Sequence, residues 1–347
     1  MRSIPLFCLL LLASVAFAAE PAPAQIFKLN DKGARTDTGA FNNAFVVGET
    51  VDGIEFAVDD AKSPNHLTLK YGTYQVEYGE SNTPDYMRAK TLEEAGTWDK
   101  AYESYVRAVQ ISKYFWVRES AIVRGAQTAV AAKKYDEAIA LTVTLEKEAP
   151  RSVLLTDALM VRGRALAAKG DTAGAAKTYE SITGMAKEWG EGAAIRGGRG
   201  AASLLAGDKK FAEAADVLSK LIIRIGKTAA PDDLAPLALE LADDQAQAGK
   251  ADDSLATLLT IVYRECSPQY QAQAHLAWAK LLAAKPDLQS QLQAFDQAAI
   301  ASAIKGGDGA TQSGAKQLAV AINEKLAKDA TLSPAEKAEY KRNLGSF

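Results

Sequence analysis

The chain has 347 residues, of which 48% are hydrophobic and 24% charged. This is a globular composition, with room for one long domain or two ordinary ones. The formal net charge of −3 argues against a dedicated nucleic-acid-binding protein, which usually carries a basic excess.

Residues 1–18 predict a signal peptide. Arg2 precedes an apolar run from Ile4 to Phe17, and Ala16-Phe17-Ala18 is a small-x-small site that predicts cleavage before Ala19. The run is shorter than the roughly 20 residues of a transmembrane helix, although an uncleaved anchor is the alternative. We expect no transmembrane segment after cleavage, and a location in the periplasm or cell envelope, or secretion. Cys266 would then be the only cysteine, which excludes an intramolecular disulfide.

Residues 19–25 are rich in proline and alanine and predict a linker, and residues 26–82 predict a small antiparallel β-domain. Within it, His66–Tyr71 and Tyr74–Tyr78 flank Gly72-Thr73, which predicts a hairpin with a two-residue type II′ turn. In that hairpin Tyr71 would face Tyr74, and the other facing pairs would be Leu69 with Val76 and Leu67 with Tyr78.

Residues 83–304 carry small residues at a repeated spacing. One set lies just inside the start of a predicted helix, and its members are Ala101, Ala138, Ala175, Ala214 and Ser254. A second set lies twelve residues before each, and consists of Ala89, Ala126, Gly163, Ala202 and Ala242. A weaker sixth copy has Ala279 and Gln291. A small residue recurring twice per unit predicts two closely crossing helices, stacked repeatedly into an α-solenoid.

These units resemble tetratricopeptide repeats, whose pattern has small residues at positions 8 and 20, an aromatic at 24 and an apolar residue at 27. The second unit matches with Ala126, Ala138, Leu145 and a proline at 150. The aromatic position holds Tyr105, Thr142, Tyr179, Leu218, Leu258 and Phe295. The spacing of 37 to 40 residues exceeds the typical 34, so helical repeats of about 40–47 residues remain an alternative. The resemblance implies a mostly α fold, a solenoid of about six helix pairs after the β-domain.

Residues 305–347 predict helices that cap the last repeat. Ser333-Pro334-Ala335-Glu336 is a capping box with proline at the first helical position. The helix after it, to about Leu344, is highly charged, as a solenoid end requires.

The sequence contains no recognisable catalytic or metal site. His66 and His275 lie in different modules, and with one thiol they form no metal-ligand cluster, so we expect no cofactor and no enzyme. The run Gly190–Gly200 lacks the features of a phosphate loop, and instead predicts close helix approach or a kink. Tyr114-Phe115-Trp116 is either a ligand platform or, as we expect, packing in the seam between repeats.

The resemblance implies a ligand groove lined by the first helix of each unit. Mapped onto this chain, the groove positions include Lys90, Gln127, Arg164, Arg196, Arg199, Asp243 and Lys280. The asparagine of the family's carboxylate clamp is absent, so that chaperone activity is not carried over. Arg164, Arg196 and Arg199 predict a basic spot for an acidic peptide or partner surface. The alternative is intramolecular pairing with Asp157, Glu188 or Glu191.

We therefore expect a non-enzymatic exported scaffold that mediates protein–protein interaction through a tetratricopeptide-like concave surface. The layout of signal peptide, β-module and repeats is similar to exported envelope proteins of Gram-negative-type bacteria. Two alternatives stay open: a periplasmic module that binds glycan or peptide, and an enzyme with an unrecognised site in the β-domain. The sequence specifies neither the partner nor the oligomeric state.

Overall fold

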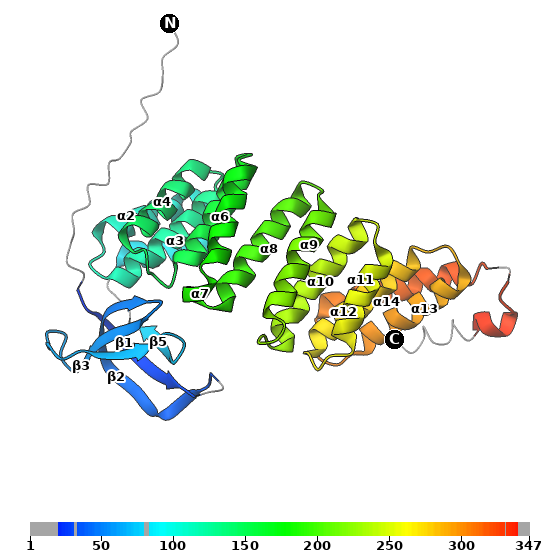
Figure 1. The fold of residues 1–347 in the computed structure, drawn as a ribbon, viewed down its shortest axis with the longest axis horizontal. Coiled ribbons are helices and arrows are strands. Elements are labelled where there is room, and N and C mark those ends of the chain that lie inside the picture. The colour runs from blue at the N-terminus through cyan, green and yellow to red at the C-terminus, as the bar shows by residue number, and fades with distance from the viewer. Residues whose placement is uncertain (1–19, 31–32, 80–82, 330, 339–347) are drawn as a thin grey trace, which may run out of the picture. The chain divides into compact units, whose positions relative to one another are not determined.

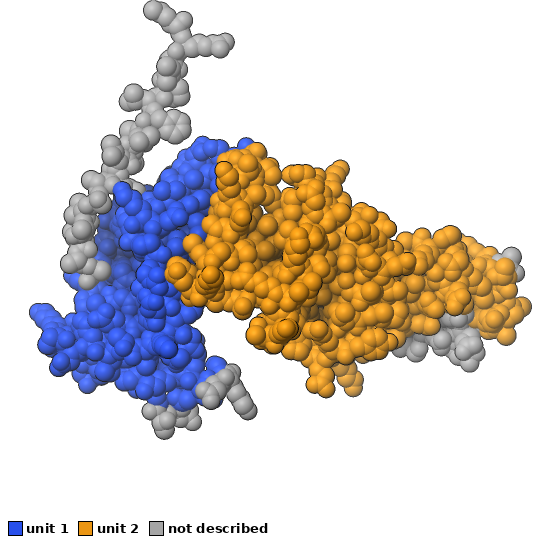
Figure 2. Space-filling model, viewed as in Figure 1, with its two compact units in different colours: residues 1–169 blue, residues 170–347 orange. Residues whose placement is uncertain are grey.

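The computed structural model describes residues 20–30, 33–79, 83–329 and 331–338. The chain forms two compact units, residues 1–169 and residues 170–347, coloured separately in Figure 2. The predicted signal peptide, residues 1–18, lies outside the described residues, so cleavage before Ala19 stays a prediction.

The β-domain is a curled antiparallel sheet in unit 1, drawn in blue in Figure 1. Its strands are β1 (Ala22–Leu29), β2 (Arg35–Thr50), β3 (Gly53–Val58), β4 (Leu67–Lys70) and β5 (Tyr74–Tyr78). Their order in the sheet is β4-β3-β2-β1-β5. Because only three residues join the two edge strands β4 and β5, the sheet must bend into a half-barrel. Ile26, Val46 and Phe56 are fully buried in its core.

The expectation of a linker over residues 19–25 is wrong from Ala22 onward. Strand β1 begins there, and Ala24 pairs with Ala44 of β2 on one side and Tyr78 of β5 on the other. Ala22, Ala24 and Ile26 are buried at every second position, as a strand requires. Alanine has a low β propensity, so the alternation was hidden by composition.

The predicted hairpin between residues 66 and 78 is also wrong. Leu69 of β4 pairs with Ile54 of β3, whereas Val76 of β5 pairs with Ile26 of β1. The Thr73 amide donates to the Lys70 carbonyl at 3.1 Å, which places Gly72, with φ +82°, third in the turn. That is the glycine position of a type II turn, which splays the flanking strands instead of pairing them.

The remainder of the described chain is helical, and the predicted fold class is confirmed: a mostly α, tetratricopeptide-like fold after an antiparallel β-domain. Unit 1 holds α1 (Pro84–Glu94), α2 (Trp98–Ile111), α3 (Phe115–Ala131), α4 (Tyr135–Glu148) and α5 (Leu155–Ala168). Unit 2 holds α6 (Thr172–Gly184), the short α7 (Ala186–Trp189), α8 (Glu191–Gly207), α9 (Phe211–Ile225), α10 (Pro231–Gln247), α11 (Ala251–Val262), α12 (Pro268–Ala283), α13 (Leu288–Ala303) and α14 (Gly309–Leu326).

The small residues that defined the repeats are buried where paired helices meet. Ala126 and Ala138, for example, are fully buried in α3 and α4. The hydroxyl of Ser254 on α11 donates to the carbonyl oxygen of Ala242 on α10 at 2.6 Å. In the weaker sixth copy, Gln291 of α13 donates to the carbonyl of Ala283 at the end of α12, at 3.0 Å. Position 20 therefore lies against the first helix of its own pair in both cases.

The glycines of α8 allow close helix approach, as one of the two sequence interpretations predicted. A Cβ added at Gly200 would lie 2.4 Å from the Tyr179 ring of α6, and one at Gly197 would lie 2.6 Å from the Tyr179 carbonyl. On the other side of α8, a Cβ at Gly198 would meet Leu221 of α9 at 2.8 Å. These distances are too short for any side chain, so glycine is required for α8 to fit between its neighbours.

Turns and caps follow the sequence signals. Asp171 caps α6 by accepting the Gly174 amide at 2.9 Å, directly after Gly170 at φ +85°. At the C-terminal end, the Ser333 amide donates to Glu336 at 2.8 Å, and the Glu336 amide donates to the Ser333 hydroxyl at 3.3 Å. This reciprocal pair confirms the predicted capping box, although the helix beyond residue 338 lies outside the described residues.

Candidate partner-binding site

The first helices of unit 1 place three of the predicted groove residues at one repeat position. Lys90 lies on α1, Gln127 on α3 and Arg164 on α5, and α3 contacts both α1 and α5. Gln127 and Arg164 are exposed and Lys90 is half-buried. None of the three side chains hydrogen-bonds or ion-pairs with another residue in the described part of the chain. We call Lys90, Gln127 and Arg164 the unit 1 row.

In unit 2, one of the predicted groove residues forms an ion pair within the chain. Arg199 of α8 forms an ion pair with Glu240 of α10, with Nε donating at 3.1 Å. Intramolecular pairing therefore accounts for Arg199, but its partner is not one of the three acids that the sequence suggested. Arg196, on the same helix, is half-buried, and Lys280 is exposed on α12. Because Arg164 belongs to the other unit, the predicted three-arginine spot stays a prediction.

The end of α10 carries the predicted groove residue Asp243 beside Asp244. Asp243 is exposed, whereas Asp244 is buried. Burial, followed by the charges of Asp243 and Glu240, raises the pKa of Asp244 to about 6.

A partly buried polar network joins α1, α2 and α3 of unit 1. Arg124 of α3 donates from Nε to Glu93 of α1 at 3.0 Å and to the hydroxyl of Tyr105 of α2 at 2.8 Å. The Tyr105 hydroxyl in turn donates to Glu93 at 2.5 Å. Three helices therefore share one charge-assisted cluster, which links α1 and α3, the helices that carry Lys90 and Gln127.

The aromatic cluster Tyr114-Phe115-Trp116 packs, as expected, rather than forming an open platform. The Trp116 ring stacks on Tyr78 of β5, with centroids 4.8 Å apart, and meets Tyr86 of α1 edge-on at 6.0 Å. Phe115 meets Tyr78 at 6.1 Å. The cluster therefore fills the seam between the first two repeats and also joins the sheet to α3, a role that the sequence did not reveal.

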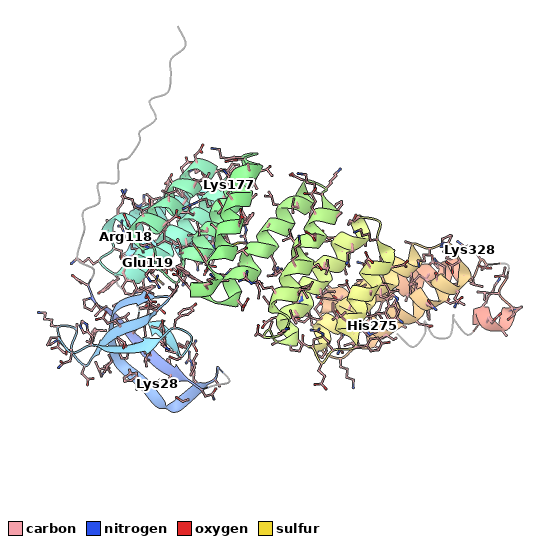
Figure 3. All side chains as sticks on the ribbon, in the orientation of Figure 1. Lys28, Arg118, Glu119, Lys177, His275 and Lys328 are labelled. Atoms are coloured by element: carbon pink, nitrogen blue, oxygen red, sulfur yellow. The ribbon has the colours of Figure 1, made fainter. Side chains whose placement is uncertain are left out.

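A pair of carboxyl groups lies at this junction between sheet and helices. The hydroxyls of Tyr74 and Tyr78 donate to the two oxygens of Glu49 on β2, at 2.8 and 2.7 Å. Glu119, on the side of α3 near the sheet (Figure 3), accepts the Ser152 hydroxyl at 2.5 Å. Burial is the main cause that raises the pKa of Glu119 to about 7; the hydrogen bond from Ser152 opposes the rise, and the charge of Glu49 contributes to it.

The tyrosines at this junction are held neutral. Burial, followed by the charge of Glu49, raises the pKa of both Tyr74 and Tyr78 far above the ordinary tyrosine value. Each hydroxyl therefore serves as a donor to Glu49, not as an acid or nucleophile at physiological pH.

The junction also has an exposed ion pair, in which Arg151 donates to Asp52 at 2.7 Å.

Both histidines make ordinary structural contacts. His66 is 2.7 Å from a carboxylate oxygen of Glu55, and His275 is 2.7 Å from the side-chain oxygen of Gln297 and stacks on Trp278. Among the described residues, no group of three or more histidine, cysteine, aspartate or glutamate side chains is arranged to hold a metal ion. In the same residues, no helix combines the length and the hydropathy needed to span a bilayer.

No family model matches the chain, and no curated protein matches it. Among solved structures, the chain is similar to the C-terminal part of a TPR repeat-containing protein from Cytophaga hutchinsonii, at 14% identity over 75% of this chain and 94% of that one, with a TM-score of 0.47. BtubC (BKLC) from P. vanneervenii is 17% identical over 66% and 91% of the two chains, with a TM-score of 0.46. The TPR2AB domain of yeast Sti1, solved in complex with pHSP90, is 14% identical over 69% and 96%, with a TM-score of 0.30. At these identities only the type of fold is shared, so function must be argued from this chain's own residues.

Proposed function

We propose that this protein is a non-enzymatic exported scaffold that binds another protein or a peptide, with the unit 1 row as its contact site. The observation that supports this most is a set of polar side chains at one position of three neighbouring first helices, none of which has a partner among the described residues. The donors of Lys90 and Arg164 and the amide of Gln127 are therefore available to a ligand that lies along these helices.

The geometry of the row fits an extended acidic segment. Neighbouring packed helices lie about 8–10 Å apart, so two steps, from Lys90 to Arg164, span roughly 20 Å. An extended peptide covers that length with about six residues. Two cations at the ends favour acidic side chains there, and the central amide of Gln127 can both donate and accept a hydrogen bond to a peptide backbone.

The non-enzymatic part of the proposal is supported by the β-domain. The hydroxyls of Tyr74 and Tyr78 both donate to Glu49, and this geometry serves the junction with α3. Export is supported by Arg2, the apolar run and the small-x-small site of the sequence. The periplasm or cell envelope, or the exterior, is the compartment that we propose.

Charge reversal of the row tests the partner site. The variant Lys90→Glu/Arg164→Glu is immobilised and used to capture partners from an envelope extract, which are identified by mass spectrometry. The matched control is Lys100→Glu/Lys147→Glu, which changes the charge equally at exposed lysines on the second helices α2 and α4. We expect the row variant to lose partners that both the control and the unaltered protein capture, with no change in melting temperature. Equal capture by both variants would show that the row is not the site.

A further inference from the structure

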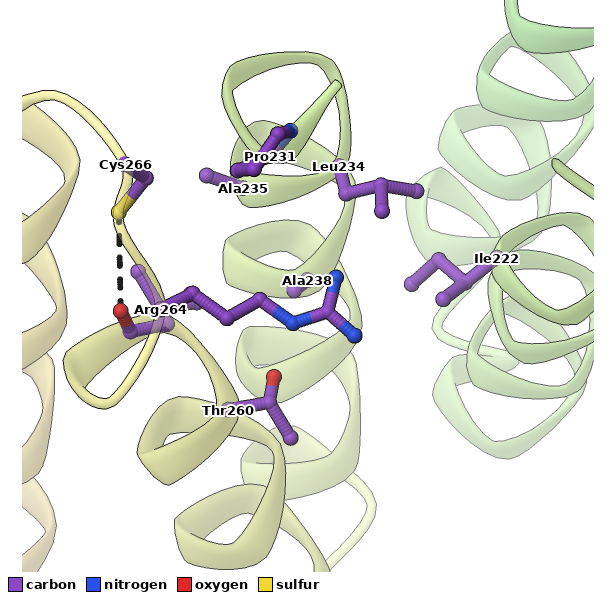
Figure 4. A pocket seen from close by; sticks show the side chains of 9 residues that line it. Ile222, Pro231, Leu234, Ala235, Ala238, Thr260, Arg264 and Cys266 are labelled. Carbon is purple, nitrogen blue, oxygen red and sulfur yellow. Dashed lines mark hydrogen bonds between the residues drawn. The ribbon is translucent and has the colours of Figure 1, made fainter. Parts of the chain in front are cut away.

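A pocket of about 100 Å³ lies in unit 2, where α9, α10 and α11 meet. Its apolar wall includes Ile222 of α9, Leu234 and Ala238 of α10, and Ile261 of α11. Figure 4 shows these helices around it. The space exists because α10 presents the small residues Ala235 and Ala238 on this side, and because α11 ends at Val262, beside the pocket.

Arg264 supplies the only charge among the residues that line the pocket. In Figure 4 its side chain extends from the end of α11 across the pocket toward α10 and α9. Arg264 is exposed and forms no ion pair with any residue that the structure describes. A nearby carboxylate, Asp232 on the first turn of α10, instead accepts the backbone amide of Ser267 at 2.6 Å.

The residues that line the pocket favour one chemical class of ligand. An arginine is always charged, and its planar fork matches the two oxygens of a carboxylate. The wall beneath it offers apolar contact but no second charge. A ligand that satisfies both parts carries an apolar group directly attached to one carboxylate. The unit 1 row, by contrast, offers two cations on an open surface, so the two sites recognise different ligands.

We infer that this pocket binds a free aliphatic monocarboxylate, with the carboxylate on Arg264 and the alkyl group between Leu234, Ala238 and Ile261. A group the size of a water molecule, such as a methyl or methylene group, takes up roughly 30 Å³. The pocket of about 100 Å³ therefore holds an alkyl group of about three or four carbons. A short branched acid therefore fits, whereas a long acyl chain would extend into solvent. The scaffold would thus carry a small-molecule site independent of its protein partner.

Titration of 3-methylbutanoate into the purified full chain tests this site. Cys266 also lines the pocket and is a free thiol, so its alkylation reports occupancy directly. We expect a saturable heat of binding and a parallel slowing of Cys266 alkylation, followed by mass spectrometry of the peptide that contains this residue. The neutral isostere 3-methylbutanamide should bind about tenfold more weakly or worse, because it lacks the charge-assisted pair with Arg264.

Two matched variants distinguish a specific role of Arg264 from an effect of the protein's net charge. Arg264→Gln should weaken 3-methylbutanoate binding about tenfold or more. Arg224→Gln removes an equally exposed arginine from α9 that does not line the pocket, and should leave binding unchanged. Melting temperatures establish that both variants fold. The comparison of acid and amide needs no variant, so it tests the site even if Arg264→Gln is unstable.

Several results would overturn the inference. If 3-methylbutanoate and 3-methylbutanamide bound with equal affinity, Arg264 would not recognise the carboxylate. If saturating 3-methylbutanoate did not slow the alkylation of Cys266, the acid would bind elsewhere. A third arm uses N-acetylleucine, which mimics a peptide terminus. If it bound tenfold or more tightly than 3-methylbutanoate, the occupant would be a peptide C-terminus and not a free acid.

Discussion

The hydroxyl of Ser254 donates a 2.6 Å hydrogen bond to the carbonyl oxygen of Ala242, across the contact between α10 and α11. Ser254 is 1% exposed, and Ala242 is 3% exposed. The two residues lie twelve apart in sequence, at the repeat positions where small side chains recur. The bond shows that the sequence spacing corresponds to a physical contact between the two helices of one pair.

Enlarging Ser254 should therefore force α10 and α11 apart. We expect Ser254→Leu to lower the free energy of unfolding by about 1–3 kcal/mol, because the side chain would overpack the contact. Chemical denaturation measures the change. Ala256→Leu, at an exposed position of the same helix, is the control and should be nearly neutral. Equal stability of the two variants would show that the assigned repeat register is incorrect.

Gly200 should tolerate no side chain. A Cβ there would lie 2.4 Å from the Tyr179 ring, and Tyr179 is only 4% exposed, so the ring has little room to move. We expect Gly200→Ala to destabilise the protein by about 1–3 kcal/mol in denaturant titration. Gly207→Ala, at the end of the same helix with no neighbouring atom within 4 Å, should be neutral or slightly stabilising. A neutral Gly200→Ala would contradict the close approach of α6 and α8.

Glu119 should make stability depend on pH. Its pKa is raised from 4.5 to about 7 in the folded protein, so the folded state binds a proton more readily than the unfolded chain between these values. The contribution of Glu119 to the free energy of unfolding therefore falls as the pH rises from about 4.5 to 7, and is constant above about pH 7. The groups that face it are Ser152, Glu49 and Tyr78.

Replacing Glu119 by glutamine removes that titration. We expect Glu119→Gln to be more stable than the unaltered protein at pH 8, by up to about 3 kcal/mol, and to show a flatter profile between pH 4.5 and 7. Thermal unfolding over this pH range measures both effects. Glu94→Gln, at an exposed glutamate of α1, is the control and should keep the original profile. An unaltered slope in Glu119→Gln would assign the pH dependence to other groups.

Export predicts a defined N-terminus. Cleavage after Ala18 should leave Ala19 as the first residue of the mature protein and remove Cys8 with the signal peptide. Intact mass spectrometry of the protein from its native compartment measures this. Replacing Ala16 and Ala18 by bulky residues should block processing, because the peptidase site requires small side chains. A native protein that begins at Met1 would support the uncleaved anchor instead.

The repeat architecture was determined by the sequence because its signals are local or strictly periodic. Small residues at the helix contacts, such as Ala126 and Ala138, and the capping box at Ser333 each act within one helix pair or one turn. Neighbouring repeats then stack by the same rule, so the fold class followed from spacing alone. For the glycines of α8 the sequence left two interpretations open, close helix approach or a kink, and the folded structure shows the close approach to α6 and α9.

The β-domain and the sites depended on contacts between residues far apart in the chain. Gly72 was consistent with either turn type, and only the pairing of β5 with β1 decided that the strands separate. Likewise, Arg199 and Glu240 are 41 residues apart in the sequence. Many pairs of residues in a repeat array have such a separation, so the sequence does not specify which acidic residue an arginine pairs with. The approach of Glu119 to Glu49 and the pocket beside Arg264 also arise only when separate elements pack, because burial and charge proximity are properties of the folded chain.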